Sequence, residues 1–402
     1  MKSRRYPTRC ILSLCLPALL VAISGTGLHA QVQETRQYGA MKVSGPYTWR
    51  NLSIYLMHGE EVQPGRKLLT LQQALEQKLV VVRETGQVSQ LTVENLSATE
   101  EIYIQSGDIV KGGRQDRTVS YDLVLAPRSG QVPLAAFCVE SGRWTRRGSE
   151  SDQRFESSNN VISTKELKLA AKRDKNQSRV WAGVRAAQEK LNGKLSVRVN
   201  APESESSLQL TLENDSVEAR VEECMRQLGG LAERHPDAVG FAFAIDGTMN
   251  SADVYATTTL FRALWPKMLR AAATESLVEG RTDTAVGHAS IDSVVASLRI
   301  ADSAAMREQT VGSTRAVTRE GKNAILFETR EEGREGWLHR NYIGGPMPDA
   351  GEDEGTMNRN VQERMIPNDR VPQRRIPRLP QIPQRRTLPR ATPQIVLPQQ
   401  QR

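Results

Sequence analysis

The residues best suited to chemistry are concentrated in one stretch of the sequence, positions 107–118. Two adjacent glycines in it leave the backbone free to turn its N–H groups toward an anion. The cationic and amide side chains around them could add charge and hydrogen bonds. The sequence therefore predicts a binding site for a small anionic or phosphorylated ligand, with the candidate residues Lys111, Gly112, Gly113, Arg114, Gln115, Asp116 and Arg117.

A second polar group follows an apolar run further along the chain and consists of Glu140, Arg143 and Trp144. If the intervening residues form a β-hairpin, the two groups meet at one end of a sheet, where loops often carry sites. Asp116 and Glu140 would then be paired carboxylates able to act as general acid and base, with Arg143 keeping one of them ionised. This arrangement would suit a hydrolase.

Two other interpretations fit the same residues. Cys138 could be a thiol nucleophile, although it lies in an apolar run with no histidine near it in sequence. Alternatively the motif is structural: Gly112 and Gly113 make a turn, the carboxylates and arginines form a salt-bridge network that fixes two loops, and Trp144 covers the core. Clustered charges occur in structural networks as well as in sites, so both interpretations stay open.

Metal chemistry and membrane spanning are both disfavoured by the sequence after residue 30. Four histidines remain there, and their positions do not match metal-ligand spacing. We therefore predict no metal and no cofactor. We also find no apolar stretch after residue 30 long enough to cross a bilayer. The histidines are His58, His235, His288 and His339.

Two regions of different character must position the candidate residues. From 40 to 145, short apolar runs alternate with glycine-containing loops, which predicts a β-rich half with an antiparallel or mixed sheet. From 146 to 345, helical patterns alternate with strands; capping-box patterns begin at Ser163 and Asp215, and Asp246-Gly247 is a hairpin signal. The sequence therefore predicts a single α+β domain over residues 31–345, β-rich first and helix-rich in its second half.

The strings GDIVKGGRQDRTV at 107–119 and FCVESGRW at 137–144 resemble the motifs of the ARG and Rhodanese-Phosphatase-superfamily-associated protein domain family. Residues 178–181 and the hairpin region 240–253 are similar to that family too, so the resemblance covers most of positions 40–280. The family is named for its association with ADP-ribosylglycohydrolases and rhodanese-like phosphatases. The resemblance therefore implies a nucleotide-derived or phosphorylated ligand.

The first thirty residues have the three parts of a secretory signal peptide. Four basic residues precede an apolar run at 11–23, and a small residue, Ala30, occupies the cleavage position. The apolar run is too short for a spanning helix, which needs roughly 20 residues; an uncleaved N-terminal anchor is the alternative. We predict that the protein is exported, either to the periplasm or outside the cell, and begins at Gln31 after cleavage.

Export also changes the expected state of the cysteines. Two of the four would be removed with the signal peptide, which leaves Cys138 and Cys224. In an oxidising compartment this pair could form a disulfide. The alternative is two separate buried thiols, because a disulfide has strict geometric requirements.

The C-terminal segment 346–402 differs in composition from the rest of the chain. Its last part, from Arg370, holds eight arginines, seven prolines and no acidic residue. It has too few apolar groups to form a core, so we predict a disordered tail. The body between the two ends is mildly acidic, although the whole chain carries +8. The tail could bind anionic lipid or an envelope polymer, or act only as a solvated spacer. A non-enzymatic envelope scaffold acting through this tail is therefore an alternative function.

Overall fold

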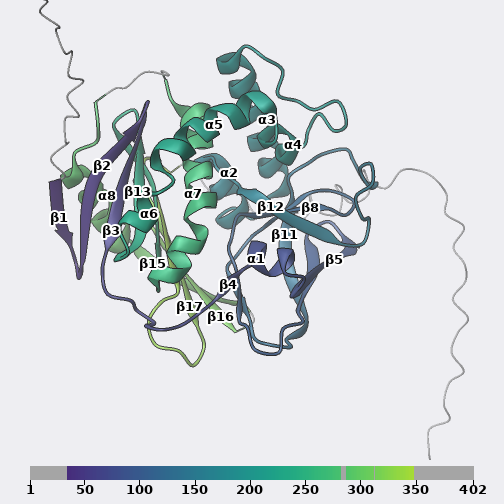
Figure 1. Ribbon diagram of the computed structural model, residues 1–402, viewed down its shortest axis with the longest axis horizontal. Helices are drawn as coiled ribbons and strands as arrows, with labels where there is room; N and C mark the ends of the chain where they lie inside the picture. The colour runs from purple at the N-terminus through teal and green to yellow at the C-terminus, as the bar shows by residue number, and fades with distance from the viewer. Residues whose placement is uncertain (1–33, 282–286, 312, 348–402) are drawn as a thin grey trace, which may run out of the picture.

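The computed structural model describes residues 34–281, 287–311 and 313–347 (Figure 1). The predicted signal peptide and nearly all of the predicted tail lie outside the described residues. Within them the chain forms eighteen strands and eight helices, with strands predominating up to residue 161 and helices following. This confirms the α+β class and its order along the chain.

The largest sheet combines strands from both ends of the described chain. Every neighbouring pair in it is antiparallel. Residues that are far apart in the sequence therefore become neighbours across it. Its nine strands, in spatial order, are β1 (Glu34–Tyr38), β2 (Met41–Trp49), β3 (Leu52–His58), β13 (Ala238–Ile245), β14 (Thr248–Tyr255), β18 (His339–Gly344), β17 (Ala324–Glu331), β16 (Thr314–Glu320) and β15 (Ala305–Val311).

Helices cover both faces of this sheet, which explains why β13 is buried along its whole length. Successive side chains of a strand point to opposite faces. Phe241 and Phe243 join the core formed with α5 (Asp215–Leu228) and α7 (Thr258–Glu279). Ala242 and Ala244 join the core formed with α8 (Ile291–Asp302) on the other face. A continuous apolar run is the expected sequence of such a two-sided strand.

A second β region packs beside the first, on the right in Figure 1. Its two sheets contribute to one shared apolar core. The short pair β4–β7 is parallel and the other pairs are antiparallel, so this region is mixed. The six-stranded sheet is β12 (Phe155–Val161), β8 (Asp108–Gly112), β9 (Arg117–Val119), β11 (Gly130–Cys138), β6 (Gln90–Asn95) and β5 (Val80–Gln87), and the three-stranded sheet is β10 (Leu123–Leu125), β7 (Ile102–Ile104) and β4 (Leu69–Thr70).

Local signals in the sequence placed several elements correctly. Asp246 and Gly247 both have positive φ, 49° and 73°, as a two-residue hairpin of type I′ requires. Thr70 caps α1 (Leu71–Glu76) with a complete capping box. Pro266 does not restart α7, which continues through it as one helix. The remaining short helices are α4 (Leu208–Leu212) and α6 (Leu231–Arg234).

Other boundaries differ from the sequence prediction. The apolar run at 119–125 is two strands, because the chain turns at Asp122, whose carboxylate accepts the Ser106 N–H at 2.7 Å. The helical pattern after Ser163 predicts one helix to about Leu191 with a break near Arg179. The break lies instead at 173–176, between α2 (Lys165–Lys172) and α3 (Gln177–Leu195). Asn176 caps α3 and thereby fixes this break. Strands β1, β12, β15 and β16 lacked an apolar pattern and are set by pairing with their neighbours.

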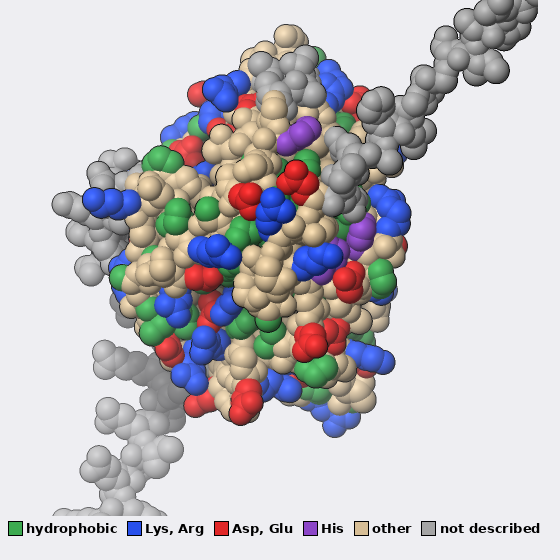
Figure 2. Space-filling view, turned by 90° about the vertical axis from the view of Figure 1, so that its left-hand side faces the viewer, with side chains coloured by type: hydrophobic (Ala, Val, Ile, Leu, Met, Phe, Trp, Pro, Cys, Tyr) green, Lys and Arg blue, Asp and Glu red, His purple; other side chains and the backbone are tan. Residues whose placement is uncertain are grey.

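The surface of the body is mixed in charge. Figure 2 shows basic and acidic side chains interspersed over the side of the molecule that carries β1. That face therefore presents no broad field of one sign. Among the helices of the described residues, none combines the length and the hydropathy that a bilayer crossing needs.

Candidate functional site

The predicted glycine motif forms the hairpin between β8 and β9, and its backbone is already occupied. The Gly112 N–H donates to Asp116 Oδ1 at 3.0 Å, and the Gly113 N–H donates to the Ser151 carbonyl at 2.9 Å. Gly113 has φ +57°, and a Cβ there would lie 2.4 Å from the Phe155 ring. Glycine is therefore required here because the turn passes under Phe155. The two N–H groups expected to cradle an anion have partners within the protein.

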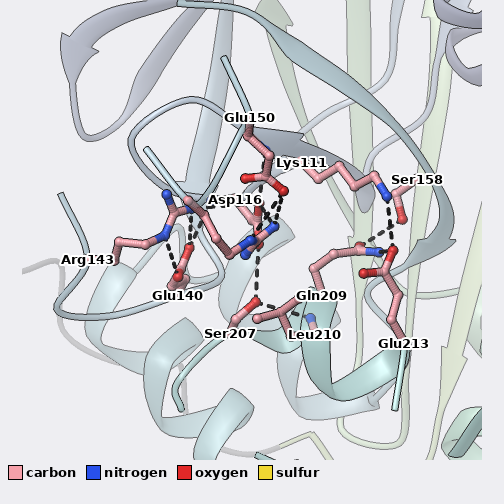
Figure 3. Close-up of polar contacts among 12 residues, drawn as sticks. Lys111, Asp116, Glu140, Arg143, Glu150, Ser158, Ser207, Gln209, Leu210 and Glu213 are labelled. Atoms are coloured by element: carbon pink, nitrogen blue, oxygen red, sulfur yellow. Dashed lines mark hydrogen bonds and ion pairs between the residues drawn. The ribbon is translucent and has the colours of Figure 1, made fainter. Parts of the chain in front are cut away.

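The two candidate carboxylates meet as predicted, and both are fully buried (Figure 3). Glu140 accepts two hydrogen bonds from Arg143, at 2.6 Å from Nε and 2.7 Å from Nη2, and a third from the Asp116 N–H at 3.2 Å. Asp116 accepts from Arg147 Nη1 at 2.8 Å and from the Ser207 hydroxyl at 3.1 Å. Arg147 and Ser207 belong to the site but were not singled out in the sequence. Each carboxylate is thus neutralised by an arginine.

The remaining cations of the motif are engaged as well. Lys111 pairs with Glu213 at 3.1 Å on the far side of the hairpin. Arg117 is completely buried and approaches Glu84 at 3.4 Å. Its guanidinium and that of Arg114 lie over the Trp144 ring, at 5.5 and 5.6 Å from its centroid. We call the polar residues in these contacts the hairpin network. Its members are Lys111, Gly112, Gly113, Arg114, Asp116, Arg117, Glu140, Arg143, Trp144, Arg147, Ser207 and Glu213.

Gln115 completes the set of predicted residues and helps to hold Arg117. Its Oε1 accepts a hydrogen bond from Arg117 Nη1 at 3.2 Å, and its side chain is fully buried. The structure therefore brings together every candidate residue predicted from the two motifs. Their polar groups are engaged by one another or by neighbouring protein groups such as Glu213 and Ser151.

Cys138 and Cys224 are free and buried, so the disulfide that the sequence left open is not formed. Cys138 lies in β11 of the six-stranded sheet, whereas Cys224 lies in α5 within the core of the nine-stranded sheet. Burial raises the pKa of Cys138 to about 11 and that of Cys224 to about 12. Both thiols are therefore protonated at neutral pH, which weakens the case for a cysteine nucleophile.

A cavity of about 360 Å³ lies elsewhere, between the α2–α3 connection and strands β16 to β18. The sequence did not point to it, because its walls come from segments that are distant in the chain. We call it the lysine cavity. Its lining includes Asp122, Lys172, Arg173, Lys175, Arg307, Phe327, Thr329 and His339.

The inner wall of the lysine cavity contains a histidine held between two carboxylates. His339 is buried, with Nδ1 at 2.8 Å from Asp122 Oδ2 and Nε2 at 3.0 Å from Asp253 Oδ1. Both ring nitrogens face acceptors, so both carry protons and the ring is an imidazolium. Burial alone would lower the pKa of His339, but Asp122 and Asp253 outweigh it and raise that pKa. Thr329 donates to Asp122 at 2.6 Å and completes this wall.

Lys172 is the last residue of α2, and its amine lines the cavity. Its Nζ donates to Asn341 Oδ1 at 2.8 Å and lies 4.9 Å from the centroid of the Phe327 ring. Burial lowers the pKa of Lys172 and prevails over the opposing effect of Asp122 and Asp253. Lys172 as a residue is half-buried, while its amine is buried and its charged form is disfavoured by its surroundings.

Further cations lie around Lys172 on the cavity lining. The ammonium of exposed Lys175 donates to the Gln309 side-chain carbonyl at 2.6 Å. Arg173 and Arg307 both contact Glu320, at 3.3 and 2.5 Å. Arg173 also pairs with Asp174 at 2.6 Å, so both guanidinium groups have carboxylate partners. The two lysines have neutral amide partners and are therefore the cations of the lining best placed to donate to an anion.

One weak signal could have identified part of this wall from the sequence. Asp253 is a charged residue in the strand that follows the Asp246-Gly247 hairpin, directly before Val254 and Tyr255, and it is buried; a buried charged residue is informative. No local pattern links it to Asp122 or His339. In the ranges that the structure describes, no three His, Cys, Asp or Glu side chains are arranged to hold a metal ion.

Comparison with known proteins places the chain in a family. The model of the ARG and Rhodanese-Phosphatase-superfamily-associated Protein domain, ARPP-1, matches residues 40–343. Neither a curated protein nor a solved structure matches the chain significantly. The matched segment includes both the hairpin network and the lysine cavity, and it covers most of the sequence. The chain therefore belongs to the ARPP-1 domain family.

Proposed function

We propose that this protein binds a small anionic ligand, such as a phosphate ester or a carboxylate, in the lysine cavity. The observation that carries the proposal is the pairing of Lys172 and Lys175. Both amines lie on one cavity, and each donates to a neutral amide oxygen. Within the described ranges, neither has a carboxylate partner at ion-pair distance. An anion would supply the missing charge.

The acidic residues on the cavity lining do not cancel this effect. Glu328 is paired with Arg330 and Arg340 at 2.5 and 2.6 Å. Glu320 is paired with Arg173 and Arg307, and Glu308 with Arg315. Asp122 shares the charge of His339 with Asp253. Each acidic residue on the lining therefore has a cationic partner. A cavity of a few hundred Å³ with few convergent polar groups is typical of a small-molecule site.

The hairpin network supports ligand binding less well. Its glycine N–H groups and both carboxylates have partners inside the protein. An anion there would have to displace Glu140 or Asp116 from a buried arginine. Breaking such a pair costs about 3–5 kcal/mol. A hydrolase using Asp116 and Glu140 would face the same cost, since each would have to release its arginine.

Thermal unfolding in the presence of inorganic phosphate, ribose 5-phosphate and ADP tests the proposal. A ligand at a hundred times its Kd should stabilise the wild type by about 2.7 kcal/mol. Lys172→Met and Lys175→Met should each reduce this response, measured against the variant's own unfolding temperature. Lys111→Met is the matched control in the hairpin network and should retain the response.

Two results would contradict the proposal. One is the absence of stabilisation of the wild type by every anion in the set. The other is loss of the response in Lys111→Met with retention in both cavity variants. The second result would place the anion site in the hairpin network.

We also propose, from the sequence of its ends, that the protein is exported and that its basic tail contacts anionic lipid or an envelope polymer. The support is the signal-peptide pattern in residues 1–30 and the eight arginines from Arg370 onward. Intact-mass measurement of the protein recovered outside the cytoplasm should give a chain beginning at Gln31. A chain that keeps Met1 in the cytoplasm would contradict export.

A further inference from the structure

We propose that Lys172 is a nucleophile that forms a Schiff base with the carbonyl of an anionic aldehyde or 2-oxo acid bound in the lysine cavity. This inference rests on the proposed function and adds a reaction to it. It follows from the position of the amine and from a comparison with the other buried lysines.

The amine is held in one orientation at the cavity. The amine donates to Asn341 Oδ1. The orientation of the Asn341 amide is itself fixed, because its Nδ2 donates to Asp253 Oδ1 at 2.9 Å. A neutral amine that donates one N–H to Asn341 keeps its lone pair and a second N–H. The cavity is the space in which a carbonyl carbon can approach that lone pair.

Other lysines with buried side chains show how Lys172 differs. Lys168 pairs with Glu275 at 2.8 Å, and Lys267 pairs with Asp108 at 2.8 Å. A carboxylate at that distance keeps the ammonium charged and therefore not nucleophilic. Lys172 has an amide partner. The two carboxylates whose charges act on it, Asp122 and Asp253, are both bound to the imidazolium of His339.

The environment of Lys172 therefore favours the neutral amine. Burial lowers its pKa, and the nearby charge of Lys168 lowers it further, while Asp122 and Asp253 act in the opposite direction. A pKa that is lower by one raises the neutral fraction of a lysine at pH 7 about tenfold. Desolvation of a lysine is a recognised route to a nucleophilic amine.

The cations of the cavity define the class of ligand. Lys175 and Arg307 lie on the same lining as Lys172 and can hold a carboxylate or phosphate group. The carbonyl of the ligand would then face Lys172. A small aldehyde or ketone that carries an anionic group satisfies both requirements.

The reaction conserves atoms and charge. The Lys172 nitrogen bonds to the carbonyl carbon, and the proton released by the nitrogen goes to the carbonyl oxygen to give a carbinolamine. Protonation of that hydroxyl by solvent lets it leave as water while a carbon–nitrogen double bond forms. The resulting iminium nitrogen returns one proton to solvent to give the imine. The overall change is amine plus carbonyl to imine plus water, and no oxidant or reductant is consumed.

Glyoxylate with sodium cyanoborohydride tests the inference on the full-length protein. Cyanoborohydride reduces an imine of glyoxylate to a stable carboxymethyl group on the lysine. Peptide mapping should find this group on Lys172 at a severalfold higher rate than on exposed Lys175, because a lowered pKa leaves a larger neutral fraction of the amine. Phosphate should slow the labelling of Lys172 by competing for the cavity.

Two variants provide the controls. Lys172→Arg keeps the charge and removes the amine, so it should abolish the fast labelling. Lys67→Arg removes an exposed lysine outside the cavity lining and should leave that labelling unchanged. Label spread evenly over exposed lysines, or concentrated on another lysine such as Lys165, would overturn the inference. Phosphate stabilisation without fast labelling would leave the proposed function intact and refute the Schiff base alone.

Discussion

The hairpin network and the lysine cavity contain similar residues in opposite states. In the hairpin network, Asp116 and Glu140 are fully buried, and they are neutralised by Arg147 and Arg143 respectively. In the lysine cavity, Lys172 and Lys175 make hydrogen bonds to neutral amides and line an open volume. The comparison shows that a dense charged motif can hold loops together through its own ion pairs. The lining of a cavity, in contrast, can come from residues that are far apart in the sequence.

The difference follows from how each charge is compensated. A buried carboxylate needs a partner. Arg143 supplies it to Glu140 from three residues away, and Arg147 supplies it to Asp116 from a later loop. In the wall of the lysine cavity, two carboxylates share one imidazolium, so this group keeps one net negative charge. Lys172 and Lys175 donate to amide oxygens and not to these carboxylates.

The largest expected effect comes from breaking the wall of the lysine cavity with His339→Asn. Asparagine cannot supply the positive charge, so two buried carboxylates lose their shared counter-ion. We expect a loss of at least about 4 kcal/mol in the free energy of unfolding, measured by urea denaturation. His288→Asn, at an exposed histidine, is the control and should cost less than about 0.5 kcal/mol. Equal stabilities of the two variants would show that the imidazolium is not required.

A smaller effect is expected from Glu140→Gln in the hairpin network. Glutamine keeps one acceptor for Arg143 but removes the charge, and Arg143 retains its bond to the Thr145 carbonyl at 2.5 Å. We expect a loss of about 3 kcal/mol in unfolding free energy. Stabilisation by phosphate, relative to the variant itself, should be unchanged. A variant that is fully stable but unresponsive to anions would reverse the roles that we assign to the two regions.

The smallest effect is expected from pH, and it should come from the lysine cavity. The folded pKa of His339 is raised above its ordinary value, so its contribution is complete below about pH 6.5, the unfolded pKa. The contribution is lost as pH rises through the folded pKa, and it amounts to about 1.4 kcal/mol for each tenfold difference in proton affinity between the folded and unfolded states. Urea denaturation of the wild type between pH 6 and pH 9 should show this decline. His339→Asn should lack it, and a decline of the same size in that variant would assign the effect to another group.

The pKa of Asp122 is shifted in the opposite direction, so its contribution to stability is lost at acidic pH. Burial would raise its pKa, but His339 and its other partners lower it well below the ordinary value. Its contribution is therefore present above the unfolded pKa of about 3.9 and is lost as pH falls below it. Neutral pH is the range in which both members of the pair are charged.

The elements of the fold that the sequence predicted well are those that depend on neighbouring residues. Thr70 and Gln73 close their capping box within one turn, and Asp246-Gly247 makes a hairpin from two positive φ values. The elements that it missed have no apolar pattern of their own. Strand β12 pairs with β8, which is distant in the sequence, whereas β15 and β16 are consecutive paired strands at the edge of the large sheet, where no apolar alternation marks them.

The sequence by itself determined the α+β class, the family and the meeting of the two polar motifs at one hairpin, because these follow from local periodicity, turn chemistry and motif identity. Only the tertiary structure decided which charges are satisfied and which face open space. Pairing of β14 with β18 brings Asp253 and His339 together, and the packing of the second β region adds Asp122 from a turn. Whether a lysine is an ion-pair partner or an available amine depends on burial and on the identity of its neighbours, and neither quantity is encoded at the lysine's own position.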